Sequence, residues 1–117
     1  GDHFSQSYYG LIHYQGSGVL KNDGIALVWT KRGAEGGDAT GMMVYGVMFL
    51  EGRALTRNIE TAYKWLLLAQ RYGGDDSSVQ DKVKGYVEYA YTHLGELARI
   101  DAQRAAAKFE EAMPIQE

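Results

Sequence analysis

The sequence predicts an all-α fold, an α-solenoid built from antiparallel helix pairs and ending in a C-terminal capping helix. Three observations support this prediction: an internal repeat, apolar side chains at helical spacing within each repeat, and glycines where helices should end. The chain has 117 residues, of which 45% are apolar and 23% charged. This composition is sufficient for one globular domain with a single core.

The internal repeat becomes visible when residues 1–36 are aligned with residues 37–72. The alignment needs no gap, and the shared residues are mostly glycine, alanine and aromatics, the types that form turns and close helix contacts. The identical pairs are Gly1 and Gly37, Asp2 and Asp38, Tyr9 and Tyr45, Gly10 and Gly46, Gly16 and Gly52, Asn22 and Asn58, Ala26 and Ala62, and Trp29 and Trp65. Each unit has room for two helices of about twelve residues.

The first unit, residues 1–36, should contain one helix from His3 to Tyr14 and another from Asn22 to Ala34. Gly16, Ser17 and Gly18 separate them, since glycine tolerates the left-handed backbone at a helix end. The second unit, residues 37–73, repeats this arrangement with helices over Ala39–Leu50 and Asn58–Arg71. In both units small residues, such as Gly10 and Ala26, permit the two helix axes to approach closely.

The closing segment, residues 74–114, departs from the repeat, because Lys82 stands where the period requires glycine. The helical apolar pattern nevertheless continues from Val79 to Leu94, and Gly95 separates it from a last helix that ends before Pro114. We therefore expect a C-terminal helical pair and cap, whose outer face is polar because no unit follows.

The first residues coincide with a repeat junction, since Gly1 and Asp2 match Gly37 and Asp38. We expect that the chain is a fragment or processed form of a longer array, or that a partner shields its first helix. An uncapped N-terminal edge also predicts self-association through Phe4, Tyr8 and their neighbours.

The first unit resembles the Sel1-like repeat. Its family markers lie in the run from Gly10 to Ala39, and they are Gly16, Gly18, Val19, Asp23, Ala26, Trp29, Ala34 and Gly37. The second unit is similar but departs at Ala54, Leu55 and Ile59, where the family prefers Gly, Val and Asp. The segment from Ala98 to Ala106 resembles the capping helix of such arrays, so the resemblance covers almost the whole chain.

The resemblance implies a right-handed superhelix related to tetratricopeptide repeats (TPR-like), whose first helices line a concave surface that binds other proteins. Helical spacing together with this resemblance assigns the following residues to that surface: Phe4, Ser7, Leu11, Tyr14, Gln15, Thr40, Met43, Val47 and Glu51. Alternatively, the apolar members of this set simply pack between neighbouring helices.

Catalytic, cofactor and metal sites have no support in the sequence. Cysteine is absent, and His3, His13 and His93 do not have metal-ligand spacing. His13 is better explained as a packed, hydrogen-bonded ring. The adjacent acids Asp75 and Asp76, like Glu110 and Glu111 near the chain end, are explained by helix capping and solvation. We assign no catalytic residue.

Charge and hydropathy exclude two classes of partner. The net charge is −3 and the basic residues are scattered, so nucleic acid is not expected to bind. No apolar stretch approaches the ~20 residues of a membrane span. Both a cytoplasmic and an exported location, in the bacterial periplasm or secreted, stay open.

These observations predict a protein–protein interaction module, either an adaptor or a specific, immunity-type inhibitor, whose partner is another protein or peptide. The first alternative is a structural spacer within a longer repeat protein. The second is a hydrolase on a helical scaffold, which the absence of cysteine weakens.

Overall fold

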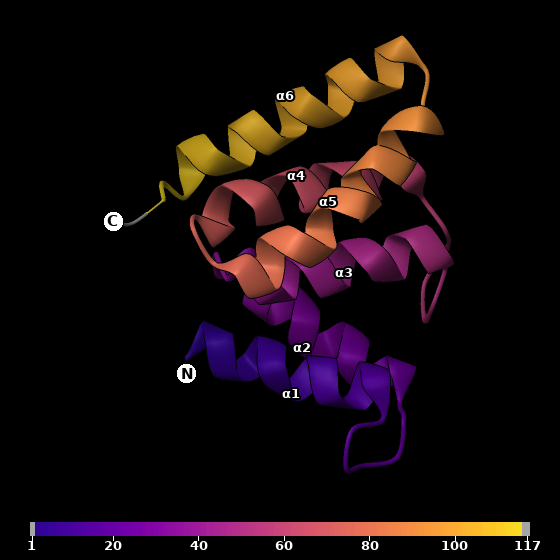
Figure 1. The fold of residues 1–117 in the computed structure, drawn as a ribbon, viewed down its shortest axis with the longest axis vertical. Coiled ribbons are helices and arrows are strands. Elements are labelled where there is room, and N and C mark those ends of the chain that lie inside the picture. The colour runs from indigo at the N-terminus through magenta and orange to yellow at the C-terminus, as the bar shows by residue number, and fades with distance from the viewer. Residues whose placement is uncertain (1, 116–117) are drawn as a thin grey trace.

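The computed structural model describes residues 2–115, in which the secondary structure consists of six α-helices without a strand. The helices are α1 (His3–Gln15), α2 (Asp23–Glu35), α3 (Ala39–Glu51), α4 (Ile59–Gly73), α5 (Ser77–Thr92) and α6 (Glu96–Ala112) (Figure 1). The predicted all-α helical repeat fold is therefore confirmed. Gly1, which the sequence places at a repeat junction, lies outside the described residues.

The helices stack as successive layers along the longest axis of the molecule (Figure 1). Helices α1 and α2 pack as one antiparallel pair and α3 and α4 as the next, while α2 and α3 join the two pairs. Helix α5 packs on α4 and also touches α3. Helix α6 lies against α4, and it diverges from α5 instead of packing along it.

The helix ends follow from local capping chemistry repeated in both units. Asn22 and Asn58 precede α2 and α4, and their side-chain oxygens accept hydrogen bonds from backbone amides three residues later. Gly16 and Gly52 end α1 and α3 with φ angles of 75° and 70°, a left-handed conformation in which a β-carbon would be strained. These signals explain why the predicted boundaries lie within two residues of the observed ones.

Helix α3 is the centre of the protein, because α1, α2, α4 and α5 all pack against it. All residues from Gly41 to Met48 are buried, so this helix shows no polar face in that stretch. The ring of Tyr45 lies 5.3 Å from Trp65, which in turn lies 5.3 Å from Phe109 in α6. The core thus runs continuously from the central helix to the C-terminal one.

Candidate protein-binding groove

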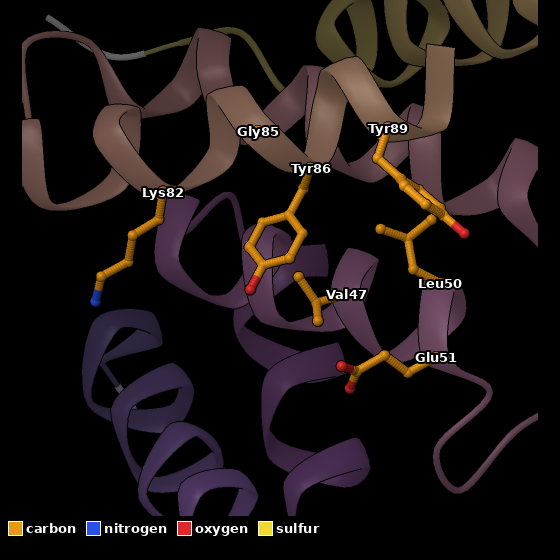
Figure 2. A pocket seen from close by; sticks show the side chains of 7 residues that line it. All are labelled: Val47, Leu50, Glu51, Lys82, Gly85, Tyr86 and Tyr89. Carbon is orange, nitrogen blue, oxygen red and sulfur yellow. The ribbon is translucent and has the colours of Figure 1, made fainter. Parts of the chain in front are cut away.

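The first helices of the successive layers, α1, α3 and α5, together form one hollowed face. Between α3 and α5 lies a hollow of about 510 Å³. Its walls are mostly apolar, and Figure 2 shows the lining residues Val47, Leu50, Glu51, Lys82, Gly85, Tyr86 and Tyr89. A second, smaller hollow continues toward α1 and is lined by Leu11, Tyr14, Gln15, Met43, Val44, Val47, Lys82 and Tyr86. The two hollows share three residues, and we call the combined surface the groove.

Helix α5 contributes a wall of four residues spaced as one helical face, Lys82, Gly85, Tyr86 and Tyr89. Tyr86 and Tyr89 are 40% and 42% exposed, and their rings extend from α5 toward Val47 and Leu50 of α3 (Figure 2). A neighbouring stripe of the same helix is buried in the core. This helix therefore carries two apolar stripes, and only one of them is needed for packing.

A charged cluster closes the α1 side of the groove and holds three helices together. Arg53 follows α3, and its Nη2 lies 2.6 Å from Oδ1 of Asp23 in α2. The Arg53 guanidinium also lies 4.0 Å from the ring centroid of Tyr14, whose hydroxyl donates to Glu51. The hydrogen bond from Arg53 holds the pKa of the Asp23 carboxyl below its usual value. Two causes raise the pKa of Tyr14: burial, which has the larger effect, and the hydrogen bond to Glu51.

Lys82 differs from this cluster because its ammonium has no counter-ion within residues 2–115. Its side chain extends from α5 toward the α1 side of the groove (Figure 2). Glu51 is the other charged residue of the wall, and it is already engaged by Tyr14 and Arg53. The uncompensated charge in the groove is therefore positive.

Of the nine residues assigned to this surface from the sequence, six line the groove: Leu11, Tyr14, Gln15, Met43, Val47 and Glu51. The structure places the other three elsewhere. Phe4 is 54% exposed and lies against Tyr8, away from the groove lining. Thr40 is half-buried in the first turn of α3.

Ser7 is the third residue outside the groove, and it is completely buried. It shares a helical face with Leu11, but near the start of α1 the chain of α2 and α3 covers that face. Gly33 and Gly41 approach so closely that a β-carbon on either would clash with the Ser7 hydroxyl. Ser7 Oγ donates instead to the carbonyl of His3, 3.0 Å away.

Sequence reasoning missed the four residues that α5 contributes, because the 36-residue period fails after Gly74. Tyr86 was included only as a member of the apolar helical pattern from Val79 to Leu94. The sequence nevertheless contains a signal for them. When the second unit is shifted by 39 residues instead of 36, Gly46 aligns with Gly85 and Val47 aligns with Tyr86. Searching for a second apolar stripe on this helix would also have found them.

The remaining polar side chains do not gather into a further site. No group of three or more His, Asp and Glu side chains that could hold a metal occurs among the described residues. His13 is buried, and its Nδ1 lies 3.0 Å from the carbonyl oxygen of Tyr9, as expected for a packed, hydrogen-bonded ring. None of the helices within residues 2–115 has both the length and the apolar character needed to cross a membrane.

Comparison with known families agrees with this architecture. The sequence model of the Sel1 repeat matches residues 3–38 and 39–69, which together make up more than half of the chain. The chain belongs to the Sel1 repeat family. The two matched Sel1 repeats correspond to the helix pairs α1–α2 and α3–α4. Sel1 repeats are typically protein–protein interaction modules, and their fold is generally a non-enzymatic scaffold.

Among solved structures, the Sel1 repeat chain is similar to c5321, a protective antigen present in uropathogenic Escherichia coli strains that displays an SLR fold. The TM-score is 0.79 at 20% sequence identity. The match covers 95% of this chain and 23% of the antigen, so the chain spans about a quarter of that protein. No curated protein matches the chain significantly.

Proposed function

We propose that this protein is a protein–protein interaction module, an adaptor or a specific inhibitor, that holds its partner in the groove formed by α1, α3 and α5. The observation that carries the proposal is the pair of exposed tyrosines, Tyr86 and Tyr89, beside an apolar floor that includes Val47 and Leu50. Tyrosine supplies a large amphipathic contact area at low conformational cost, and it is enriched where proteins bind each other.

The surroundings of these tyrosines have the anatomy of a binding surface. The floor is rigid, because Val47 and Leu50 belong to the central helix. The rim is polar, with Gln15, Glu51 and Lys82 around the apolar part. An apolar centre inside a polar rim is the arrangement in which a few residues contribute most of the binding energy.

A structural spacer within a longer repeat protein is the second candidate, and one observation favours it. Phe4 and Tyr8 on α1 are 54% and 53% exposed and stack on each other, as a surface for a preceding element would. A spacer role makes no use of the groove, so a change confined to the groove distinguishes the two functions.

The test is affinity capture from a lysate of the source organism with the parent chain and two matched variants. Tyr86→Glu places a charge in the groove, and Leu97→Glu places the same charge on α6 at a residue that is 78% exposed. Both sites are exposed, so circular dichroism should show intact folding. We expect one protein to be captured by the parent and by Leu97→Glu but not by Tyr86→Glu.

The captured protein would then be purified and titrated against the same variants. Substitution of a groove residue that anchors the interface should weaken binding at least tenfold, whereas the control substitution should leave binding unchanged. Equal binding to Tyr86→Glu and to the parent would show that the groove is not the working surface and would favour the spacer role.

A further inference from the structure

Away from the first and last turns of the described helices, Gly85 is the only glycine whose small size the fold does not explain. At Gly10 a β-carbon would lie 2.6 Å from Cγ2 of Thr30, and at Gly46 it would lie 3.0 Å from Cγ of Leu66. Gly33 and Gly41 would clash with Ser7, as described above, and Gly24 and Gly73 lie in the terminal turns of their helices. At Gly85 a β-carbon would meet nothing within 4 Å.

Glycine at this position also works against the helix. Residue 85 lies in the middle of α5, where glycine is less favourable than alanine because it loses more conformational freedom on folding. Neither packing nor backbone geometry requires glycine here, since its φ angle is not positive. Because glycine has no β-carbon, it permits a close approach between a helix backbone and a ligand.

The position of Gly85 shows where such an approach would occur. It lies in the groove wall between Lys82 on one side and Tyr86 and Tyr89 on the other (Figure 2). Bare backbone is thus exposed beside two partly exposed rings and an ammonium group. Because that ammonium has no counter-ion among the described residues, an acidic group on the ligand would complement it.

We propose that the groove binds an extended, acidic segment of the partner chain. In this arrangement an apolar side chain enters the hollow beside Val47, the backbone runs along α5 over Gly85, and a carboxylate pairs with Lys82. The inference rests on the proposed function and specifies the chemistry of the partner. From residue 82 to residue 89 the helix rises about 10 Å, which an extended chain spans in about three residues. The carboxylate and the apolar side chain should therefore be close in sequence.

The test uses random peptides of twelve residues displayed on phage and selected against the parent chain. Enriched peptides should combine Asp or Glu with an apolar residue within about four positions. A synthetic peptide of the enriched sequence, titrated by fluorescence anisotropy, should bind Gly85→Ala and Lys82→Glu at least tenfold more weakly than the parent. Lys84→Glu is the matched control, because it makes the same charge change outside the groove lining and should bind like the parent.

Charge exchange provides the second readout. A peptide with its acid replaced by lysine should bind Lys82→Glu better than it binds the parent. Any of three results would overturn the inference. The first two are the absence of peptide enrichment and the enrichment of sequences without an acid. The third is unchanged binding to a Gly85→Ala variant that circular dichroism shows to be folded. Each of these outcomes leaves the interaction module itself intact, because lysate capture with Tyr86→Glu tests that function separately and a folded partner needs no linear segment.

Discussion

Glycine has opposite energetic roles at two positions of this protein. At Gly10 the backbones of α1 and α2 touch, because a β-carbon there would lie 2.6 Å from Thr30 Cγ2 and 2.9 Å from the Thr30 backbone nitrogen. At Gly85 the same addition would project into open space. The residue type is identical, and only the neighbouring helix decides its effect.

Alanine substitution should separate these roles. Gly10→Ala should lower the free energy of unfolding by about 1–3 kcal/mol, because the two helices must move apart. Gly85→Ala should raise it by about 0.5–1 kcal/mol, because alanine favours the helix. Urea unfolding followed by circular dichroism measures both changes. Shifts in the same direction would contradict the contrast between the two sites.

The ion pair between Asp23 and Arg53 predicts a pH dependence. Arg53 lowers the folded-state pKa of Asp23 below its ordinary value of 3.8. The stabilisation is therefore complete above the unfolded-state pKa, and it disappears as the pH falls through the folded-state value. Asp23 is partly exposed, so water screens the pair and limits its contribution to about 1 kcal/mol or less.

Comparing Asp23→Asn with the parent tests this dependence. The variant should be less stable than the parent at pH 7, and the difference should shrink toward zero well below pH 3.8. Thermal unfolding at several pH values between 7 and 2 measures the difference. A gap that stays constant across this range would mean that ionisation of Asp23 does not cause it.

At the scale of helices, α6 closes the core by lying across α4. Phe109 makes the aromatic contacts of this interface, since its ring centroid lies 5.3 Å from that of Trp65 and 5.8 Å from that of Tyr72. The ion pair of Arg71 with Glu110 lies beside it at 2.7 Å, on a more exposed part of the same interface. Buried aromatic area should therefore contribute more to this interface than charge does.

Two variants of this interface should differ in size of effect. Phe109→Ala should lower the free energy of unfolding by about 2–3 kcal/mol, less than for a fully buried ring because Phe109 is only half-buried. Arg71→Ala should change it by less than about 1 kcal/mol. Denaturant unfolding followed by tryptophan fluorescence reports both. A larger loss of stability from Arg71→Ala than from Phe109→Ala would contradict the expectation that buried aromatic area contributes more to this interface than charge does.

At the scale of the whole molecule, the outer face of α1 has a counterpart inside the protein. The repeat aligns Tyr8 and Ile12 with Val44 and Met48, 36 residues later. Val44 and Met48 are buried and share a core cluster with Ala26 of the preceding unit. The corresponding face of α1 carries exposed Tyr8, so it has the shape of a helix-stacking surface without a described element on it.

This exposed face should promote self-association. Light scattering of the parent should give a mass that rises above the monomer value of 13.0 kDa as concentration increases. Phe4→Ser combined with Tyr8→Ser should keep the mass at that of a monomer, since both residues are exposed and contribute little to the core. A monomeric parent at high concentration would contradict this prediction.

The sequence by itself determined the repeat, the order of the helices and their ends. These features depend on local chemistry: the capping oxygens of Asn22 and Asn58, the left-handed glycines Gly16 and Gly52, and apolar spacing. It also placed most of the α1 and α3 groove residues, because helical spacing fixes which side chains share a face. Functional use of that face stays a prediction.

Only the tertiary structure decided which stripe of α5 faces the groove and which helix α6 covers. Helix α5 buries Val79, Val83 and Ala90, and this packing turns Gly85 and Tyr86 outward in a register that the 36-residue period does not give. The same is true of Ser7, whose helical face is open near Leu11 but is covered where α2 and α3 cross it. Spacing fixes a face, whereas contact between distant segments decides whether that face is core or surface.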